Sequence, residues 1–249
     1  MIAYITGATS GFGLSIARRL AKEGYNLIIT GRRKERLSDL EKELQANGVD
    51  VWVSNYDVRD IEAVKKAIDS LPEQWKEIDV LVNNAGLAAG LGTIQEGSFD
   101  DWNRMIDTNV KGLLYVSRLI APLMIERRCG HIINIGSVAG KDVYPNGNVY
   151  CATKHAVDAI SKAMRIDMLP YGIKVSQICP GAAETEFSLV RFHGDKEKAD
   201  NVYKGYQPLS GDDIADIVAY LVAMPKHVCI NDLTVTCLSQ ANALHFHKK

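Results

Sequence analysis

The chain has 249 residues, 47% of them hydrophobic and 24% charged, with a formal net charge of -1. This length and composition suit one α/β domain with a full core, and the near-neutral charge argues against nucleic-acid or anionic-membrane partners. The five cysteines are scattered without a C-x-x-C pair, which argues against a disulfide framework or a zinc site and predicts no metal. Met1 leads directly into a short apolar run with no signal peptide, and no run approaches the roughly 20 residues of a membrane span, so we expect a cytoplasmic protein.

The first predicted element is a buried parallel strand over the apolar run Ile2 to Thr6. The run breaks into the glycine-rich sequence TGATSGFG, and an amphipathic helix follows from Leu14 to Glu23. A glycine-rich turn is often only a turn, but one between a strand and a helix exposes backbone N–H groups that bind a pyrophosphate. We therefore predict a dinucleotide site that contains Gly7, Thr9, Ser10, Gly11, Phe12 and Gly13.

The second apolar run, Asn26 to Thr30, bears on the choice between NAD and NADP. In units that bind NAD, an acidic residue near the end of this strand holds the ribose hydroxyls. Here Gly31, Arg32 and Arg33 follow instead, and a guanidinium grips a 2′-phosphate in a fork. The alternative is that both arginines merely begin the next helix in solvent, where their charge would oppose the helix dipole. We predict NADP as the cofactor.

Strands and helices alternate along the rest of the chain. Apolar runs and helical periodicity predict strands at 49–54, 79–83, 131–135, 174–179 and 233–236, and helices at 33–47, 61–71, 101–128, 148–169 and 211–223. This alternation predicts a single α/β domain, a doubly wound parallel sheet of the Rossmann type with helices on both faces. We expect residues 1–100 mainly to bind the cofactor and residues 101–249 mainly to supply catalysis and substrate binding.

Polar residues near the ends of these strands are candidates for the ligand site, because ligands of open α/β sheets bind there. Asp57 and Val58 follow the third strand and are placed to meet an adenine edge. Asn83 and Asn84 end the fourth strand and bond either the backbone of neighbouring strands or the cofactor ribose. Asn109 lies within the predicted long helix, where asparagine competes with the backbone for hydrogen bonds. It is either a buried, satisfied amide or a group that holds a water beside the catalytic lysine.

The segment GSVAGKDVYPNGNVYCATK carries the candidate catalytic residues Ser137, Tyr150 and Lys154. Tyr150 and Lys154 are four residues apart on a predicted helix, so their side chains share a face. A nearby ammonium lowers the pKa of a phenol, and such a phenol exchanges a proton with an alcohol or ketone oxygen that Ser137 could hold. The alternative is a half-buried tyrosine beside a solvated lysine, but this is the only Tyr-x-x-x-Lys in the sequence.

Together these residues resemble the short-chain dehydrogenases/reductases over essentially the whole chain. The resemblance rests on Thr6-Gly7-x-x-x-Gly11-x-Gly13, Asn83-Asn84-Ala85-Gly86, Asn109, Ser137, Tyr150-x-x-x-Lys154 and Pro180-Gly181-x-x-x-Thr185. It implies that Tyr150 is the general acid/base, that Lys154 lowers its pKa and holds the nicotinamide ribose, and that Ser137 and Tyr150 contact the substrate oxygen. It also implies that Asn109 anchors a water that relays protons. The cofactor-binding residues that it adds are Asn84, Tyr150, Lys154, Pro180, Gly181 and Thr185.

A closer resemblance is to the NADP-dependent 3-hydroxy acid dehydrogenases, which act on serine, allo-threonine and 3-hydroxyisobutyrate and also reduce malonic semialdehyde. It rests on NNAGLAAG, MIDTNVKGL, GHIINIGSVAG, NGNVY and TEFSLVRFHGD. Members of this group are usually tetramers, so the resemblance implies a homotetramer. Two features depart from the group, both near the expected substrate: Asn146 stands where relatives often have glycine, and the segment 181–184 is more compact.

The segment 185–208, called the lid below, has the composition of a mobile active-site cover. It is charged and poor in aliphatic residues, with Gly194 and Gly205 as hinges. If the substrate is a small acid, Arg191 is the candidate to bind its carboxylate, because a guanidinium binds a carboxylate bidentately. The alternatives for Arg191 are a solvated lid charge and a contact with a neighbouring subunit.

Three functions fit the sequence. The first is an NADP-dependent oxidoreductase that interconverts a small 3-hydroxy acid (serine, allo-threonine, 3-hydroxyisobutyrate or 3-hydroxypropionate) and its 3-oxo acid or semialdehyde. The second keeps the chemistry and changes the substrate to a ketone, a sugar or a 3-oxoacyl thioester. The third is a non-catalytic NADP(H) sensor built on the same fold. Such sensors commonly lose the tyrosine or the lysine, and this chain has both, so we expect the first.

Overall fold

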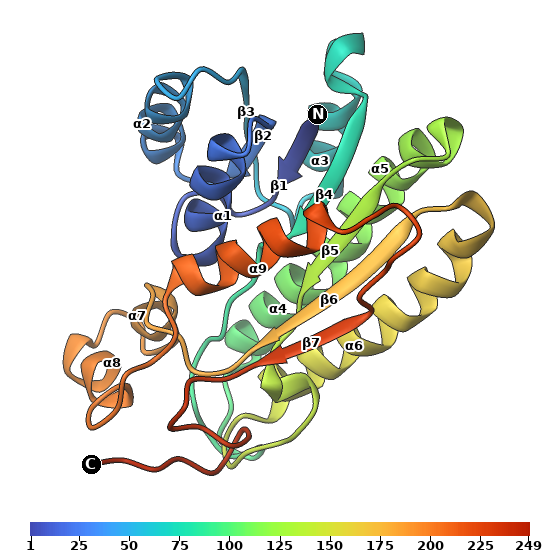
Figure 1. Ribbon diagram of the computed structural model, residues 1–249. Helices are drawn as coiled ribbons and strands as arrows, with labels where there is room; N and C mark the ends of the chain where they lie inside the picture. The colour runs from blue at the N-terminus through green and yellow to red at the C-terminus, as the bar shows by residue number, and fades with distance from the viewer.

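A seven-stranded parallel sheet forms the centre of the computed structural model, which describes residues 1–249 (Figure 1). The order across the sheet is β3-β2-β1-β4-β5-β6-β7. The strand order reverses between β1 and β4, so the loops that leave these strands diverge and open a crevice at their carboxyl ends. The predicted doubly wound α/β fold is confirmed. The strands are β1 (Ile2–Ile5), β2 (Asn26–Gly31), β3 (Val51–Asn55), β4 (Ile78–Asn83), β5 (His131–Ile135), β6 (Lys174–Pro180) and β7 (Asp232–Val235).

Helices cover both faces of the sheet. Alternate residues of β1 face the two layers: Ala3 and Ile5 join one hydrophobic core, and Ile2 and Tyr4 join the other. A strand buried on both faces needs apolar side chains at every position, which explains the unbroken apolar runs of the sequence. The first core lies under α1 (Gly11–Lys22), α2 (Lys34–Gln45) and α9 (Gly211–Ala223), and the second under α3 (Ile61–Asp69), α5 (Leu113–Arg127) and α6 (Asn148–Met168).

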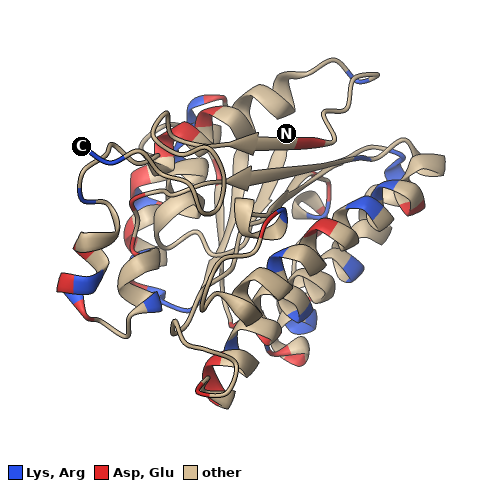
Figure 2. Ribbon diagram, turned by 90° about the horizontal axis from the view of Figure 1, so that it is seen from below, with Lys and Arg blue, Asp and Glu red and all other residues tan.

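Charged residues of both signs occur along the helices, while the strands contain few of them (Figure 2). Arg18 of α1 pairs with Glu43 of α2 at 2.7 Å, and Arg127 of α5 pairs with Asp79 of β4 at 2.8 Å. This mixing is consistent with the near-neutral net charge of the chain. None of the helices combines the length and the hydropathy that crossing a membrane requires.

The prediction of one long helix at 101–128 is wrong in two respects. Helix α4 (Phe99–Ile106) begins earlier, because the Ser98 hydroxyl caps it by accepting a hydrogen bond from Asp101 N at 3.3 Å. A π-helical stretch, Asp107–Gly112, then separates α4 from α5. Hydrophobic periodicity does not reveal a single wide turn, although such turns are frequent at functional sites.

Two short helices, α7 (Phe187–Arg191) and α8 (Lys196–Val202), form half of the lid. The predicted hinge residues Gly194 and Gly205 have φ values of +91° and +88°, in the left-handed region that favours glycine. Their conformations fit the predicted hinges, while movement of the lid stays a prediction.

The C-terminal tail, to which the sequence assigned no role, packs against the lid. The rings of Phe246 and Tyr206 have centroids 5.3 Å apart, and Lys249 N donates a hydrogen bond to Gly205 O at 2.9 Å. Figure 1 shows α7, α8 and the C-terminus gathered at the end of the sheet toward which β6 and β7 point. The tail and the lid therefore border the site at the carboxyl ends of the strands.

Candidate active site

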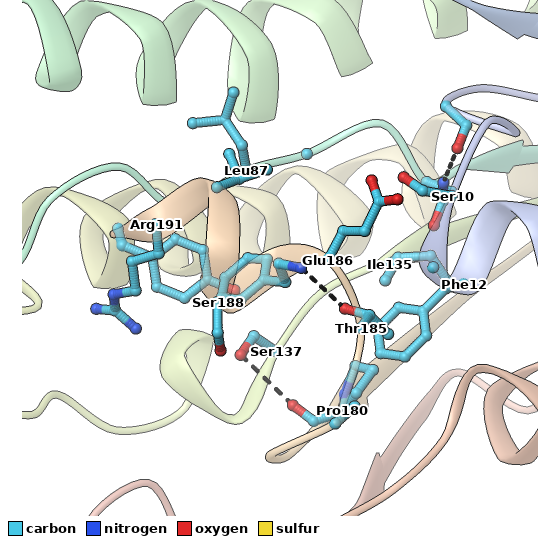
Figure 3. A pocket seen from close by; sticks show the side chains of 18 of the residues that line it. Ser10, Phe12, Leu87, Ile135, Ser137, Pro180, Thr185, Glu186, Ser188 and Arg191 are labelled. Carbon is cyan, nitrogen blue, oxygen red and sulfur yellow. Dashed lines mark hydrogen bonds between the residues drawn. The ribbon is translucent and has the colours of Figure 1, made fainter. Parts of the chain in front are cut away.

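A cavity of about 630 Å³ lies at the carboxyl ends of the strands and extends from the end of β2 to the lid. In Figure 3, Ser10 and Phe12 enter it from one side and Ser137 and Arg191 lie on the other. Two predicted site residues, Gly13 and Asn109, lie behind its walls. The predicted residues that line it are Gly7, Thr9, Ser10, Gly11, Phe12, Arg32, Arg33, Asp57, Val58, Asn84, Ser137, Tyr150, Lys154, Pro180, Gly181, Thr185 and Arg191.

Close packing shapes the glycine turn between β1 and α1. A Cβ atom on Gly13 would lie 2.3 Å from Gly7 O and 2.4 Å from Asn84 Nδ2, so no side chain fits there. Asn84 Nδ2 donates hydrogen bonds to Thr6 O at 2.8 Å and to Gly7 O at 3.1 Å. The sequence left two possible partners for Asn84, the backbone of a neighbouring strand and the cofactor ribose. Its side chain binds the neighbouring backbone. Gly13 and Asn84 thus hold the turn in place from behind.

The N-terminus of α1 has the properties of an anion site. Its first turn contains no acidic residue, and the side chain of the N-cap residue Ser10 makes no capping bond. The Ser10 hydroxyl is engaged instead by Arg33 Nη2, at 2.6 Å. The first N–H groups of a helix have no intrahelical partner, and they carry the positive end of the helix dipole. Gly11 and Phe12 present these groups at the cavity wall, so the turn fits the pyrophosphate of the predicted cofactor.

The two arginines after β2 have different surroundings. Arg33 is engaged by the protein: Nε and Nη2 donate to Thr9 Oγ1 at 3.1 and 3.0 Å, and Nη1 donates to Glu186 of the lid at 2.7 Å. The Arg32 side chain is 56% exposed, and its ionic contact, with Asp57, is long at 3.6 Å. Both guanidiniums border the cavity, so a role for either in binding the 2′-phosphate stays a prediction.

Helix α6 and the end of β5 bring the three candidate catalytic residues together. Tyr150 and Lys154 lie one turn apart on α6, and both are buried. Lys154 Nζ donates a hydrogen bond to Ile135 O at 2.9 Å and lies 5.9 Å from the centre of the Tyr150 ring. The Ser137 hydroxyl accepts a hydrogen bond from Ala139 N at 3.1 Å. A hydroxyl, a phenol and an ammonium therefore border the same space.

Burial moves the pKa values of the phenol and the ammonium in opposite directions. Burial raises the pKa of Tyr150 above its ordinary value, with a contribution from Tyr144, while Ser137 and Arg191 act in the opposite direction. Burial lowers the pKa of Lys154 to about 8. The predicted fall of the Tyr150 pKa is therefore wrong for the protein alone, because burial outweighs the nearby positive charge. At neutral pH the phenol keeps its proton, which is the form that donates to a carbonyl oxygen.

We expect Lys154→Met to change how stability depends on pH. The ammonium has a pKa of about 8 in the folded protein and an ordinary pKa of 10.5, so the unfolded chain holds this proton more tightly. Its burial destabilises the fold fully below about pH 8, and the penalty disappears as the pH rises toward 10.5. Between about pH 7 and about pH 9.5 the penalty changes by roughly 2 kcal/mol. Urea unfolding should show the variant gaining about this much, relative to the wild type, at the lower pH.

The control for this prediction is Lys162→Met on the same helix. The Lys162 side chain is 62% exposed and pairs with Asp158 at the surface. Its replacement should leave the pH dependence of unfolding close to that of the wild type. A difference between Lys154→Met and the wild type that is the same at both pH values would contradict the assigned cause.

Asn109 lies in the π-helical stretch with a buried side chain. Its Oδ1 accepts a hydrogen bond from Leu87 N at 2.8 Å, and its Nδ2 donates to Leu87 O at 2.8 Å and to Thr153 Oγ1 at 3.0 Å. Of the two predicted roles of Asn109, a buried amide with all its hydrogen bonds made and a holder of water, the first describes this side chain. It joins the loop after β4 to helix α6 beside Lys154. A role in holding a relay water stays a prediction.

Arg191, the last residue of α7, lies against the candidate catalytic tyrosine. Its guanidinium carbon is 5.7 Å from the centre of the Tyr150 ring and 5.3 Å from the centre of the Tyr144 ring, and Nη2 donates to Tyr144 Oη at 2.8 Å. Its Nε is buried and has no hydrogen-bond partner in the protein. Gly90 N holds the backbone here by donating to Arg191 O at 2.9 Å. A partly buried guanidinium with an unpaired N–H is suited to bind an anion.

Known proteins resemble this chain along its whole length. The family model for short chain dehydrogenases matches residues 1–195. The chain belongs to the short-chain dehydrogenase family. It is 48% identical to the NADP-dependent 3-hydroxy acid dehydrogenase YdfG of Salmonella typhi, over 98% of this chain and 97% of that protein. It is 45% identical to sulfoacetaldehyde reductase 2 of Chromohalobacter salexigens, over 96% of this chain and 95% of that protein.

A solved structure agrees with this assignment. The closed form of serine dehydrogenase complexed with NADP+ is 45% identical in sequence, with a TM-score of 0.94 and coverage of 100% of both chains. The predicted family is therefore confirmed by sequence and by fold.

Several residues around the cavity of this short-chain dehydrogenase were missed by sequence reasoning. Tyr144 and Glu186 hold Arg191 and Arg33, as described above. The ring of Phe187 lies edge-on to the Tyr150 ring, with centroids 5.6 Å apart. These residues lie in loops or short helices, where no periodic pattern marks them. The motif TEFS, which the resemblance had used, was the one available signal for Glu186 and Phe187.

The tail and one loop residue complete the walls. Gln240 Oε1 accepts a hydrogen bond from Ala182 N at 2.7 Å, and Phe246 also lines the cavity. Asn146 has a φ of +63°, in the left-handed region that glycine and asparagine adopt most readily. The replacement of glycine by Asn146, noted in the sequence as a departure, is thus compatible with this backbone.

Proposed function

We propose that this short-chain dehydrogenase interconverts a small 3-hydroxy acid and the corresponding 3-oxo acid or semialdehyde. The proposed substrates are serine, allo-threonine, 3-hydroxyisobutyrate and 3-hydroxypropionate. The observation that supports this most is the position of Arg191 beside Tyr150, with a buried and unpaired Nε. An acid whose hydroxyl meets the phenol has a guanidinium close by for its carboxylate.

The enzyme class and the cofactor follow from the family and its members. The protein is a dehydrogenase that acts on hydroxyl groups, because it belongs to the short-chain dehydrogenase family. The prediction of NADP is confirmed by a relative that is NADP-dependent and a structural neighbour that contains NADP+. The residues agree with this assignment, because Arg32 and Arg33 follow β2 at the cavity and no acidic residue stands at the end of that strand.

The proposed mechanism divides the proton chemistry among three residues. In oxidation, the Tyr150 phenolate takes the proton of the substrate hydroxyl, and in reduction the phenol returns it to the carbonyl oxygen. Ser137 holds that oxygen by a hydrogen bond in both directions. Lys154, fixed by its bond to Ile135 O, places positive charge beside the phenol. Bound NADP supplies the acceptor for the hydride that the carbinol carbon loses.

The first test follows the absorbance of reduced nicotinamide with purified protein and NADP. The substrate panel is serine, allo-threonine, 3-hydroxyisobutyrate, 3-hydroxypropionate and a neutral secondary alcohol. We expect reduction of NADP with the acids and little with the neutral alcohol. Turnover with the neutral alcohol alone would remove the carboxylate role from Arg191. No turnover with any of them, while NADP binds, would favour another carbonyl substrate or the sensor.

A small aldehyde that carries a sulfonate in place of the carboxylate is a second candidate. The relative named sulfoacetaldehyde reductase 2 motivates it, and a guanidinium binds a sulfonate through the same kind of charge-assisted hydrogen bonds. Oxidation of NADPH with sulfoacetaldehyde and with malonic semialdehyde would rank the two. A ketone, a sugar or a 3-oxoacyl thioester carries no acidic group beside the reacting carbonyl, so none of them would use the free Nε of Arg191 in this way.

We also propose that the enzyme is a homotetramer in the cytoplasm. Five free cysteines suit a reducing compartment. Apolar side chains on α5 and α6 are exposed, with Leu114 at 42% and Ile166 at 73%, and an assembly would cover them. Light scattering after size-exclusion chromatography measures the assembly, and a monomer mass would contradict a tetramer.

A further inference from the structure

The lid is joined to the cofactor side of the cavity by one acidic side chain. Glu186, next to the first turn of α7, accepts hydrogen bonds from Arg33 Nη1 at 2.7 Å and from Arg36 Nη1 at 2.6 Å. Figure 3 shows its carboxylate turned toward the glycine turn at Ser10. The two arginines belong to the start of α2, some 150 residues away in the sequence. The Glu186 side chain makes no capping bond to α7, so its bonds to the arginines are its principal contacts.

The lid crosses the glycine turn at this point. Thr185 packs on Gly11, since a Cβ atom built on Gly11 would lie 3.4 Å from the Thr185 Cβ. The cavity continues on both sides of this crossing, toward Arg32 on one side and toward Tyr150 on the other. A dinucleotide that spans the cavity must therefore pass beneath Thr185 and Glu186.

The arginines that hold Glu186 are not the ones that are free for a phosphate. Arg33 already directs Nε and Nη2 to Thr9 and Ser10 of the glycine turn. Arg36 does not line the cavity. Arg32 is the more exposed guanidinium at the cavity edge. This division leaves Arg32 as the principal candidate for the 2′-phosphate and gives Arg33 a connecting role between the glycine turn and the lid.

We propose that Glu186 is the latch of the lid, and that its bonds to Arg33 and Arg36 must break each time the cofactor enters or leaves. Glu186 is then a positioning residue that sets the rate of cofactor exchange rather than a catalytic residue. Because its partners are partly exposed, the latch is modest in strength and is screened by salt. The proposal concerns cofactor exchange alone and does not depend on which substrate the enzyme uses.

Two explanations of Glu186 predict opposite results. If Glu186 is a latch, Glu186→Gln releases both NADPH and NADH faster, by roughly five- to tenfold, because the lid opens more easily. If Glu186 is merely an anion that repels the 2′-phosphate from the arginines, its neutralisation makes NADPH leave more slowly and has little effect on NADH. The release rate of NADH distinguishes the latch from the repulsion, because NADH lacks the 2′-phosphate.

The experiment is stopped-flow fluorescence of bound NADPH or NADH, displaced by an excess of the oxidised cofactor. Arg36→Gln tests the partner outside the cavity, and we expect it to release NADPH faster as well. The double variant Glu186→Gln/Arg36→Gln should be no faster than Glu186→Gln alone, because both changes break the same contact. Added salt should speed release from the wild type and have less effect on Glu186→Gln.

The matched control is Glu184→Gln, which neutralises an exposed carboxylate two residues away. Its release rates should equal those of the wild type. Unchanged release from Glu186→Gln, slower release of NADPH alone, or effects of Glu186→Gln and Arg36→Gln that simply multiply would each overturn the latch.

Discussion

Tyr150→Phe is expected to lower kcat by about three orders of magnitude, the range that loss of a general acid/base produces. The substitution removes only the phenolic oxygen. The ring keeps its packing in α6, where the residue is buried and lies 5.6 Å, centroid to centroid, from Phe187. Binding of NADP should therefore stay close to that of the wild type. Steady-state turnover with the best substrate of the panel, together with a fluorescence titration of NADPH, measures the two effects separately.

The control is Tyr220→Phe, which removes a phenolic oxygen from a tyrosine that is 53% exposed on α9. It should have wild-type turnover. If Tyr150→Phe turns over within about tenfold of the wild type, the proton reaches the substrate by another route and the role of Tyr150 is wrong. Loss of NADPH binding along with turnover would point to a damaged cavity instead.

The raised pKa of Tyr150 gives the wild type a pH dependence that differs between the two directions. Oxidation needs the phenolate, so its rate should rise with pH from neutral to alkaline solution. Reduction uses the protonated phenol, which is already present at neutral pH, so it should not rise in the same range. The two profiles, measured on the same enzyme preparation, check this assignment.

The fold was predictable because its signals are local and repeated. Each strand buried on both faces leaves an unbroken apolar run, and each covering helix leaves an amphipathic period, so element order and fold class follow. Helix α9 was predicted with its bounds as the structure has them, at Gly211–Ala223. The π-helical stretch at Asp107–Gly112 was not, because one wide turn hardly disturbs the apolar stripe on either side.

The site was predictable where residues of special chemistry follow a strand or share a helical turn. Ser137, Tyr150 and Lys154 have these placements, and all three line the cavity. The sequence could not show which side chains would meet from distant segments. Glu186 on Arg33 and Phe246 on Tyr206 are contacts of this kind, and no spacing rule connects them. Nor could it show that burial would outweigh the hydrogen bond from Ser137 and the charge of Arg191 in setting the pKa of Tyr150.

Arg191→Ala is expected to lower kcat/KM for the hydroxy acids by about 100-fold, which corresponds to loss of a hydrogen-bonded contact between charged groups. Turnover of a neutral secondary alcohol should change only a few-fold, because that substrate has no carboxylate for the guanidinium. The comparison between acid and alcohol matters, since Arg191 also packs on Tyr144 and Tyr150. A loss that came from disturbed packing would affect both substrates equally.

Arg191→Lys and Lys196→Ala refine this test. Arg191→Lys keeps the positive charge and loses the planar fork, so its acid turnover should fall between those of the wild type and Arg191→Ala. Lys196→Ala removes another cation of the lid, 80% exposed at the side chain, and should leave selectivity unchanged. Equal losses for acid and alcohol in Arg191→Ala would assign Arg191 to packing of the tyrosines. If Arg191→Ala lowers turnover of the acids alone and Lys196→Ala changes neither turnover, Arg191 is the group that selects small acids over neutral alcohols.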